Sequence, residues 1–172
     1  MGDVTYLDPG QQQLTATEKN LTDVIHCLTI SLSNEALLLP NAAVAEVIGY
    51  VEPEPLDGAP DWFLGRIAWR ERLVPLIALE HATASQDEVG KGPKGNRIAI
   101  LNTLNGNQEL PYIAIISQGI PSLNVVRNED IASVEVLPAT RSSIAEIVEL
   151  NGEQRIILDI DDLENRILNI HT

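Results

Sequence analysis

The residue types that most often carry out chemistry are few in this sequence and stand far apart. The three histidines are His26, His81 and His171, and none has a second histidine or a carboxylate at the spacing of a metal site. Cys27 is the only cysteine, so the chain can form neither an internal disulfide nor a multi-cysteine metal site. The local signatures GxSxG, HExxH and CxxC are absent. We therefore expect no enzyme activity, no metal and no cofactor.

Three aspartates near the end of the chain resemble a cation site until their spacing is checked. Asp159, Asp161 and Asp162 lack the central glycine and the terminal glutamate of a calcium loop. Helix capping explains them better, with Asp161 or Asp162 at the start of a short amphipathic C-terminal helix. The apolar residues at helical spacing after them are Leu163, Ile167 and Leu168.

The charged residues of one apolar segment are the strongest candidates for a binding role. Residues 62–79 read WFLGRIAWRERLVPLIAL, in which three arginines stand among residues typical of a buried strand. Arg66, Arg70 and Arg72 alternate with apolar residues at the period of two of a strand, which predicts a common outer face. The alternative is a solvated strand face. In a chain with 25 acidic and 11 basic residues, this positive cluster favours docking.

A segment upstream supplies the opposite charge. Glu46 follows a short turn, and a proline-rich connection then leads to residues 62–79. This order predicts two neighbouring strands with an ion pair between Glu46 and Arg70, which at a surface contributes about 0.2–1 kcal/mol. The aromatic residues Trp62, Phe63 and Trp69 are expected to pack in the core rather than to form a peptide-binding hot spot.

The elements that must position these residues are short strands. From Asp23 onward, roughly ten apolar runs alternate with turn residues, which is typical of an all-β sandwich or a pair of barrels. A helical turn is expected over residues 41–47. The runs read VIHCLTISL, EALLLP, VAEVIGYV, FLGRIAW, RLVPLIAL, RIAILNTL, LPYIAIIS, SVEVLP, SIAEIVEL and QRIILDI. A length of 172 residues suits one domain, or two small subdomains that share a core.

Composition excludes several classes of partner. The net charge of −14 would repel phosphate backbones, so we expect no nucleic acid partner and no anionic membrane surface. The sequence shows no signal peptide and no apolar run of membrane-spanning length, which predicts a cytoplasmic protein without direct membrane insertion. Residues 1–20 are polar and are interpreted as a mobile tail, and residues 81–96 as a solvated connection.

The candidate binding segments resemble the CheW-like proteins, the adaptor family that couples chemoreceptors to the CheA histidine kinase. That family pairs V-x-E-V/I with G-x-x-x-x-R-G-x-x-V-P-x-x-D-L. This chain has VAEV at residues 44–47, GRIAWR at 65–70 and VPLIAL at 74–79. Its ILDIDDL at 157–163 resembles the family's closing Leu-Asp-x-x-x-Leu. The resemblance covers roughly residues 23–167, and the spacing from glycine to Val-Pro is its most specific part.

Three positions depart from the family pattern. Glu71 replaces the glycine of the Arg-Gly pair, Ala78 replaces the aspartate before Leu79, and Ser117 stands where Val-Val-Asp is usual. The first half of the chain is therefore recognisable and the second half divergent. We expect a system-specific relative, for instance of a pilus-type chemosensory pathway, rather than the central adaptor of flagellar chemotaxis.

The resemblance implies a fold, a function and a site. It implies two small SH3-like β-barrels that share a core over residues 21–172, with no catalytic site. It also implies a groove in the first barrel for the chemoreceptor's cytoplasmic tip and a barrel-end face for the regulatory domain of a CheA-type kinase. The candidate receptor-binding residues are Val44, Glu46, Val47, Arg66, Arg70 and Arg72.

Two other functions stay open on the sequence alone. One is an interaction module that shares the CheW fold but works outside chemotaxis. The other is a small-molecule-binding β-barrel protein, which is disfavoured because no titratable group has an evident catalytic partner.

Overall fold

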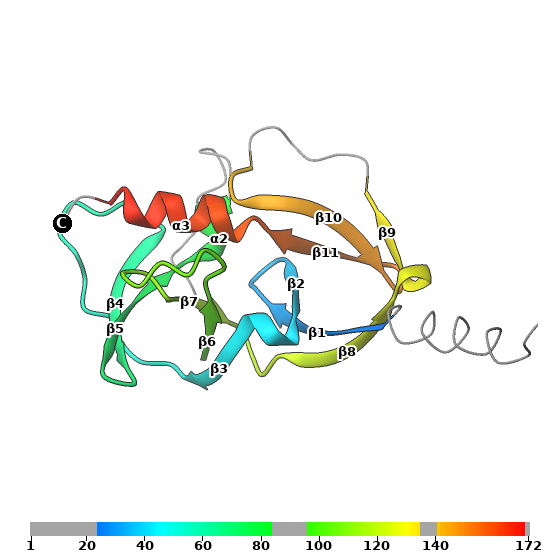
Figure 1. Cartoon of the computed structure of the whole chain (residues 1–172), viewed down its shortest axis with the longest axis horizontal. Helices are drawn as coiled ribbons and strands as arrows, with labels where there is room; N and C mark the ends of the chain where they lie inside the picture. The colour runs from blue at the N-terminus through cyan, green and yellow to red at the C-terminus, as the bar shows by residue number, and fades with distance from the viewer. Residues whose placement is uncertain (1–23, 84–95, 135–140, 171–172) are drawn as a thin grey trace, which may run out of the picture.

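The chain is mainly β, with strands arranged in two sheets. The computed structural model describes residues 24–83, 96–134 and 141–170. The tail expected over residues 1–20 and most of the connection expected over 81–96 lie outside these ranges. Figure 1 shows the two sheets beside each other along the long axis of the molecule.

The first sheet, sheet A, contains six strands in the order β8-β1-β2-β11-β10-β9. All its neighbouring pairs are antiparallel except β2 and β11, which are parallel. Its strands are β1 (Val24–Ser31), β2 (Ala36–Pro40), β8 (Ser122–Arg127), β9 (Ile131–Ser133), β10 (Ile144–Leu150) and β11 (Glu153–Leu158).

The second sheet, sheet B, contains five strands in the order β3-β6-β7-β5-β4, of which only β5 and β7 are parallel. Its strands are β3 (Val44–Gly49), β4 (Phe63–Trp69), β5 (Arg72–Ile77), β6 (Arg97–Asn102) and β7 (Tyr112–Ser117). The helical elements are η1 (Asn41–Ala43), α2 (Leu79–Thr83), η2 (Asn128–Asp130) and α3 (Ile160–Leu168). The turn expected over residues 41–47 is therefore limited to η1.

Three buried apolar clusters hold the fold together. One lies on the inner face of sheet B and includes Ile67, Leu76 and Ile98. Another lies on the inner face of sheet A, around Cys27 and Val148. The largest is shared, since it combines residues of both sheets with residues of α2 and α3. The expected arrangement of two β subdomains on a common core is confirmed.

The expected C-terminal helix is α3, although its first turn begins earlier than predicted. Asp159, not Asp161 or Asp162, is the N-cap, and its carboxylate accepts a hydrogen bond from the Asp162 N–H at 2.9 Å. Leu163 is fully buried and Ile167 nearly so in the shared cluster, whereas Leu168 is exposed. The helix thus covers the boundary between the two sheets (Figure 1).

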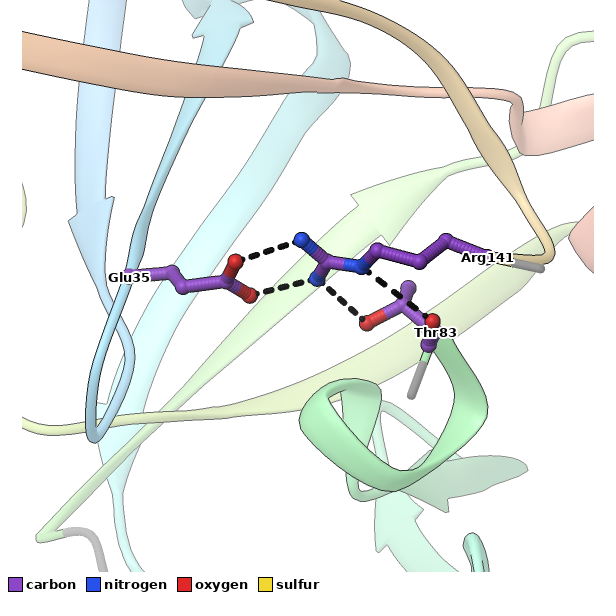
Figure 2. Close-up of polar contacts among 3 residues, drawn as sticks. All are labelled: Glu35, Thr83 and Arg141. Carbon is purple, nitrogen blue, oxygen red and sulfur yellow. Dashed lines mark hydrogen bonds and ion pairs between the residues drawn. The ribbon is translucent and has the colours of Figure 1, made fainter. Parts of the chain in front are cut away.

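A polar cluster connects the end of α2 to sheet A. Figure 2 shows the Arg141 guanidinium facing the carboxylate of Glu35, a residue of the turn between β1 and β2. Two hydrogen bonds of 2.6 Å join the two groups. Arg141 also donates to the carbonyl oxygen and the hydroxyl of Thr83, each at 3.3 Å. Arg166 of α3 donates to the Ala82 carbonyl at 2.8 Å. Two arginines therefore cap the C-terminal end of α2, where cations are favoured.

Three predicted elements need correction. The strand found near the run expected over residues 133–138 is β9, which ends at Ser133; Val134 is not in a strand, and residues 135–140 lie outside the described ranges. Strand β8 was not predicted, although Leu123 and Val125 of SLNVVR alternate with polar residues; both are exposed, and Val126 is the residue that this strand buries. Residues 81–83, expected to begin a solvated connection, instead end α2. The helix persists there because Ala82 and Thr83 are buried.

Candidate docking surface

The hairpin of β4 and β5 carries the arginines that the sequence singled out. Trp69 pairs with Arg72 across the strands, so Arg70 and Glu71 form a two-residue turn. Their φ angles are 44° and 61°, and a two-residue type I′ turn requires positive φ at both positions. Arg70 and Glu71 therefore form the tip of the hairpin. Their backbone conformations are ones that glycine adopts more easily than other residues.

The prediction that the three arginines share one outer face is wrong. Residues paired across antiparallel strands point to the same face, so Arg72 lies on the face of Trp69 and Arg66 on the face of Pro75. Those two faces are opposite. The period of two fails because the chain reverses at the hairpin turn between Arg66 and Arg72. Arg70 belongs to the turn itself.

Glu46 and Arg70 form the expected ion pair. Their Oε2 and Nη2 atoms are 2.9 Å apart, and the side chains are 39% and 65% exposed, respectively. The indole N–H of Trp69 donates to the same Oε2 at 3.1 Å. The Arg70 guanidinium carbon lies 4.6 Å from the centre of the Trp69 ring. One carboxylate oxygen thus accepts from two neighbouring side chains.

The strands that carry this pair are not neighbours, contrary to the prediction. β3 and β4 are the two edges of sheet B. Glu46 of β3 reaches Arg70 beyond β4, so the pair bridges the open edges of the curved sheet. Sequence spacing could identify the partners but could not show that three strands separate them within the sheet.

Gly65 explains how the proline-rich connection packs on the hairpin. Glu54 and Arg66 exchange two backbone hydrogen bonds of 2.8 Å, which lays the connection along β4. Gly65 has a φ of +137°, and a Cβ atom there would lie 2.2 Å from the Glu54 carbonyl oxygen. Only glycine allows this close approach of two backbones.

The two valines predicted for the surface point away from Glu46. Val44 and Val47 are partly buried and pack against the shared core cluster. Glu46 pairs with Ile100, whose side chain belongs to the sheet B cluster together with Trp69. Of the six predicted residues, the structure brings Glu46 and Arg70 into contact. Arg72 shares the face of Trp69, whereas Arg66 and the two valines lie elsewhere.

Of the aromatic residues expected in the core, Trp69 and Phe63 are buried and Trp62 is partly buried. Trp69 and Phe63 are each 7% exposed. The Trp69 ring also meets Tyr112 edge to face, with ring centres 4.9 Å apart. Trp69 also has a role that the sequence did not predict, since its indole N–H binds the Glu46 carboxylate. A buried indole N–H needs an acceptor. The position of Trp69 next to Arg70 in the sequence could have indicated that Glu46, the partner of Arg70, is that acceptor.

A second candidate surface lies in sheet A. An apolar hollow of about 360 Å³ is lined by residues near the start of β1 and the end of β8. Figure 1 shows these strand ends on the side of the molecule away from sheet B. Ile25 is 55% exposed at this hollow. Its lining residues are Ile25, Cys27, Leu38, Pro40, Val126, Arg127, Asn128, Ile131 and Ile157. Several of these residues also belong to the buried cluster of sheet A, so the hollow exposes part of that cluster. Its shape and lining suit apolar side chains of a partner.

Titratable groups of the described residues form no site of their own. Burial raises the pKa of the Cys27 thiol, so the thiol stays protonated at neutral pH. Burial, a 3.1 Å hydrogen bond to Glu52 and the charge of that carboxylate raise the pKa of Tyr50. Within residues 24–83, 96–134 and 141–170, histidine, cysteine and acidic side chains form no group able to hold a metal ion. No helix in these ranges is long and apolar enough to cross a membrane.

Comparisons with known proteins agree with this architecture. Residues 26–167 match the family described as CheW-like domain. The crystal structure of the scaffolding protein TtCheW from Thermoanaerobacter tengcongensis superposes with a TM-score of 0.63 at 20% sequence identity. The match covers 78% of this chain and 88% of that chain, and at this identity it shows the fold alone. A search of curated proteins found no match.

Proposed function

Because the chain belongs to the family of CheW-like domains, we propose that it is a non-enzymatic adaptor that couples chemoreceptors to a CheA-type histidine kinase in bacterial chemosensory signalling. The observation that carries the proposal is the Glu46–Arg70 pair, since it forms at the two positions that match the family's receptor-facing surface. The cytoplasm is the compartment in which such a coupling takes place. We further propose a pilus-type pathway, from the divergence at Glu71, Ala78 and Ser117.

The receptor-facing surface is centred on the tip of the β4–β5 hairpin. Arg70 is 65% exposed and Glu46 39% exposed, so both remain available to a partner. Arg72 extends the positive charge on the Trp69 face. Glu71 lies between the two arginines and Glu46 pairs with Arg70, so the tip presents charges of both signs side by side, a pattern that favours a partner with complementary charges. Arg66 is left out, because it points to the opposite face.

The kinase-facing surface is the apolar hollow of sheet A. Its lining is mostly aliphatic, and such surfaces suit a protein partner that inserts apolar side chains. The regulatory domain of the kinase is itself CheW-like in this family, so two barrel ends of similar shape would pack together. The two surfaces lie on different sheets, which leaves both accessible at once.

Two matched charge variants test the assignment of surfaces. Arg70→Glu places like charges beside Glu46 and should weaken binding of a soluble receptor-tip hairpin by about 2–5 kcal/mol. Ile25→Glu places a charge in the sheet A hollow and should weaken binding of the kinase regulatory domain instead. Both side chains are more than half exposed. The free energy of unfolding of each variant should therefore lie within about 1 kcal/mol of that of the native chain.

Binding of each variant to each partner is measured by titration calorimetry. The proposal predicts that each variant loses one partner and keeps the other. Unaltered receptor binding by folded Arg70→Glu would require withdrawal of the receptor assignment. A bound metabolite in the natively purified protein, with no binding to either partner, would favour a small-molecule-binding barrel. Binding to neither partner and to no metabolite would favour an interaction module outside chemotaxis.

A further inference from the structure

Trp69 contacts both residues of the Glu46–Arg70 pair. Its indole N–H donates to Glu46 Oε2 at 3.1 Å, and Arg70 donates to that same oxygen at 2.9 Å. The face of the Trp69 ring carries the Arg70 guanidinium at 4.6 Å. Tyr112 supports the ring edge to face at 4.9 Å. The pair therefore rests on a buried, rigid platform.

An ion pair alone would not hold Arg70 in one position. Exposed pairs are weak because two long side chains lose conformational entropy when they meet. Trp69 is only 7% exposed and lies in the sheet B cluster, so its ring cannot move away. The Arg70 guanidinium lies over this ring, and the indole N–H binds the carboxylate oxygen that Arg70 also binds, so both contacts restrict the Arg70 side chain. Arg70 has therefore already lost part of its side-chain conformational entropy in the unbound chain.

We propose that Trp69 is the positioning residue of the docking surface, and that it presents the outward edge of Arg70 to a carboxylate of the docked partner. This inference rests on the proposed function. A guanidinium has about five N–H groups, and within the described residues Arg70 donates only to Glu46. The remaining donors face solvent, since the side chain is 65% exposed. A planar guanidinium held in one orientation matches the two oxygens of a carboxylate.

Pre-organisation gives the proposal its measurable consequence. A guanidinium that is already ordered loses less entropy on binding, so affinity depends on the platform as well as on the charge. Trp69→Phe keeps an aromatic ring in the core and removes the N–H that holds Glu46. We expect it to weaken binding of the receptor-tip hairpin by up to about tenfold, the cost of ordering one long side chain on binding. Trp62→Phe is the matched control, because Trp62 lies against Arg166 and not at the Glu46–Arg70 pair, and it should bind like the native chain.

A double-mutant cycle separates positioning from mere support of the fold. Trp69→Phe should have less than about a twofold effect in an Arg70→Ala background, because there is then no guanidinium to orient. An equal loss in both backgrounds would overturn the proposal. Glu46→Gln gives the same test without a change in the core. It should weaken binding in the native background, and an equal loss beside Arg70→Ala would also overturn the proposal.

The outcomes also distinguish this inference from the proposed function. If Arg70→Ala weakens receptor binding and neither Trp69→Phe nor Glu46→Gln does, the surface stands and the positioning role of Trp69 is wrong. If Arg70→Ala leaves receptor binding unchanged, the receptor surface is wrong and the positioning role falls with it.

Discussion

Replacing Gly65 with alanine should destabilise the fold more than any other glycine-to-alanine change in the described part of sheet B. The added Cβ would lie 2.2 Å from the Glu54 carbonyl oxygen, 2.7 Å from the Glu54 carbonyl carbon and 3.1 Å from the Pro55 Cα. All three atoms belong to the backbone, so no side-chain rotation can relieve the overlap. The connection over residues 50–62 would have to move away from β4.

The expected loss of stability follows from two contributions. The φ of +137° at Gly65 imposes strain on any other residue, which costs about 1–3 kcal/mol. Separation of the backbones breaks the two 2.8 Å hydrogen bonds between Glu54 and Arg66, at about 1 kcal/mol each. The total is about 3–5 kcal/mol. For a chain of this length that lowers the melting temperature by about 10 °C.

Urea denaturation followed by tryptophan fluorescence measures the difference directly. Gly106→Ala is the matched control, since Gly106 also has a positive φ (+63°) but no atom within 4 Å of the added Cβ. It should cost only about 1 kcal/mol. Equal stabilities for the two variants would show that the connection does not pack on Gly65 as described.

Three further outcomes are expected. Glu71→Gly should stabilise the chain by about 1 kcal/mol in urea denaturation, because the φ of 61° at the hairpin tip disfavours any residue with a Cβ. A decrease would show that the Glu71 side chain makes a compensating contact. Arg141→Leu should destabilise by about 2 kcal/mol, since its Glu35 partner is left two-thirds buried, while Arg155→Leu at the pair with exposed Glu153 should cost less than about 1 kcal/mol. Equal costs would contradict this ranking. The Cys27 thiol, 6% exposed with a raised pKa, should react with a maleimide far more slowly in the native chain than in urea, and equal rates would contradict its burial.

The fold class followed from the sequence because apolar runs and turn residues are local signals. They predicted the strands and the C-terminal helix, including burial of Leu163 and Ile167. They could not predict β8, whose stability comes from pairing with β1 and from one buried residue, Val126. Such a strand exists because of its neighbours in the sheet, and its own sequence carries little of that information.

The docking surface was predicted in part. Its geometry depends on a turn for which the sequence gives no usual signal. Opposite charges at Glu46 and Arg70 indicated the pair correctly. The turn at Arg70-Glu71 lacks the asparagine or glycine that marks a two-residue hairpin, so the strand period was continued through it. That single omission placed Arg66 and Arg72 on one face. The role of Trp69 was also hidden, because it depends on how sheet B curves to bring its two edges together.

The claim that this chain is an adaptor requires that both partners bind at the same time. Size-exclusion chromatography with light scattering, applied to the chain mixed with a receptor-tip hairpin and a kinase regulatory domain, tests it most directly. The surfaces at the β4–β5 hairpin and at the sheet A hollow predict one complex with the mass of all three proteins. Two separate binary complexes that compete for the chain would contradict the account.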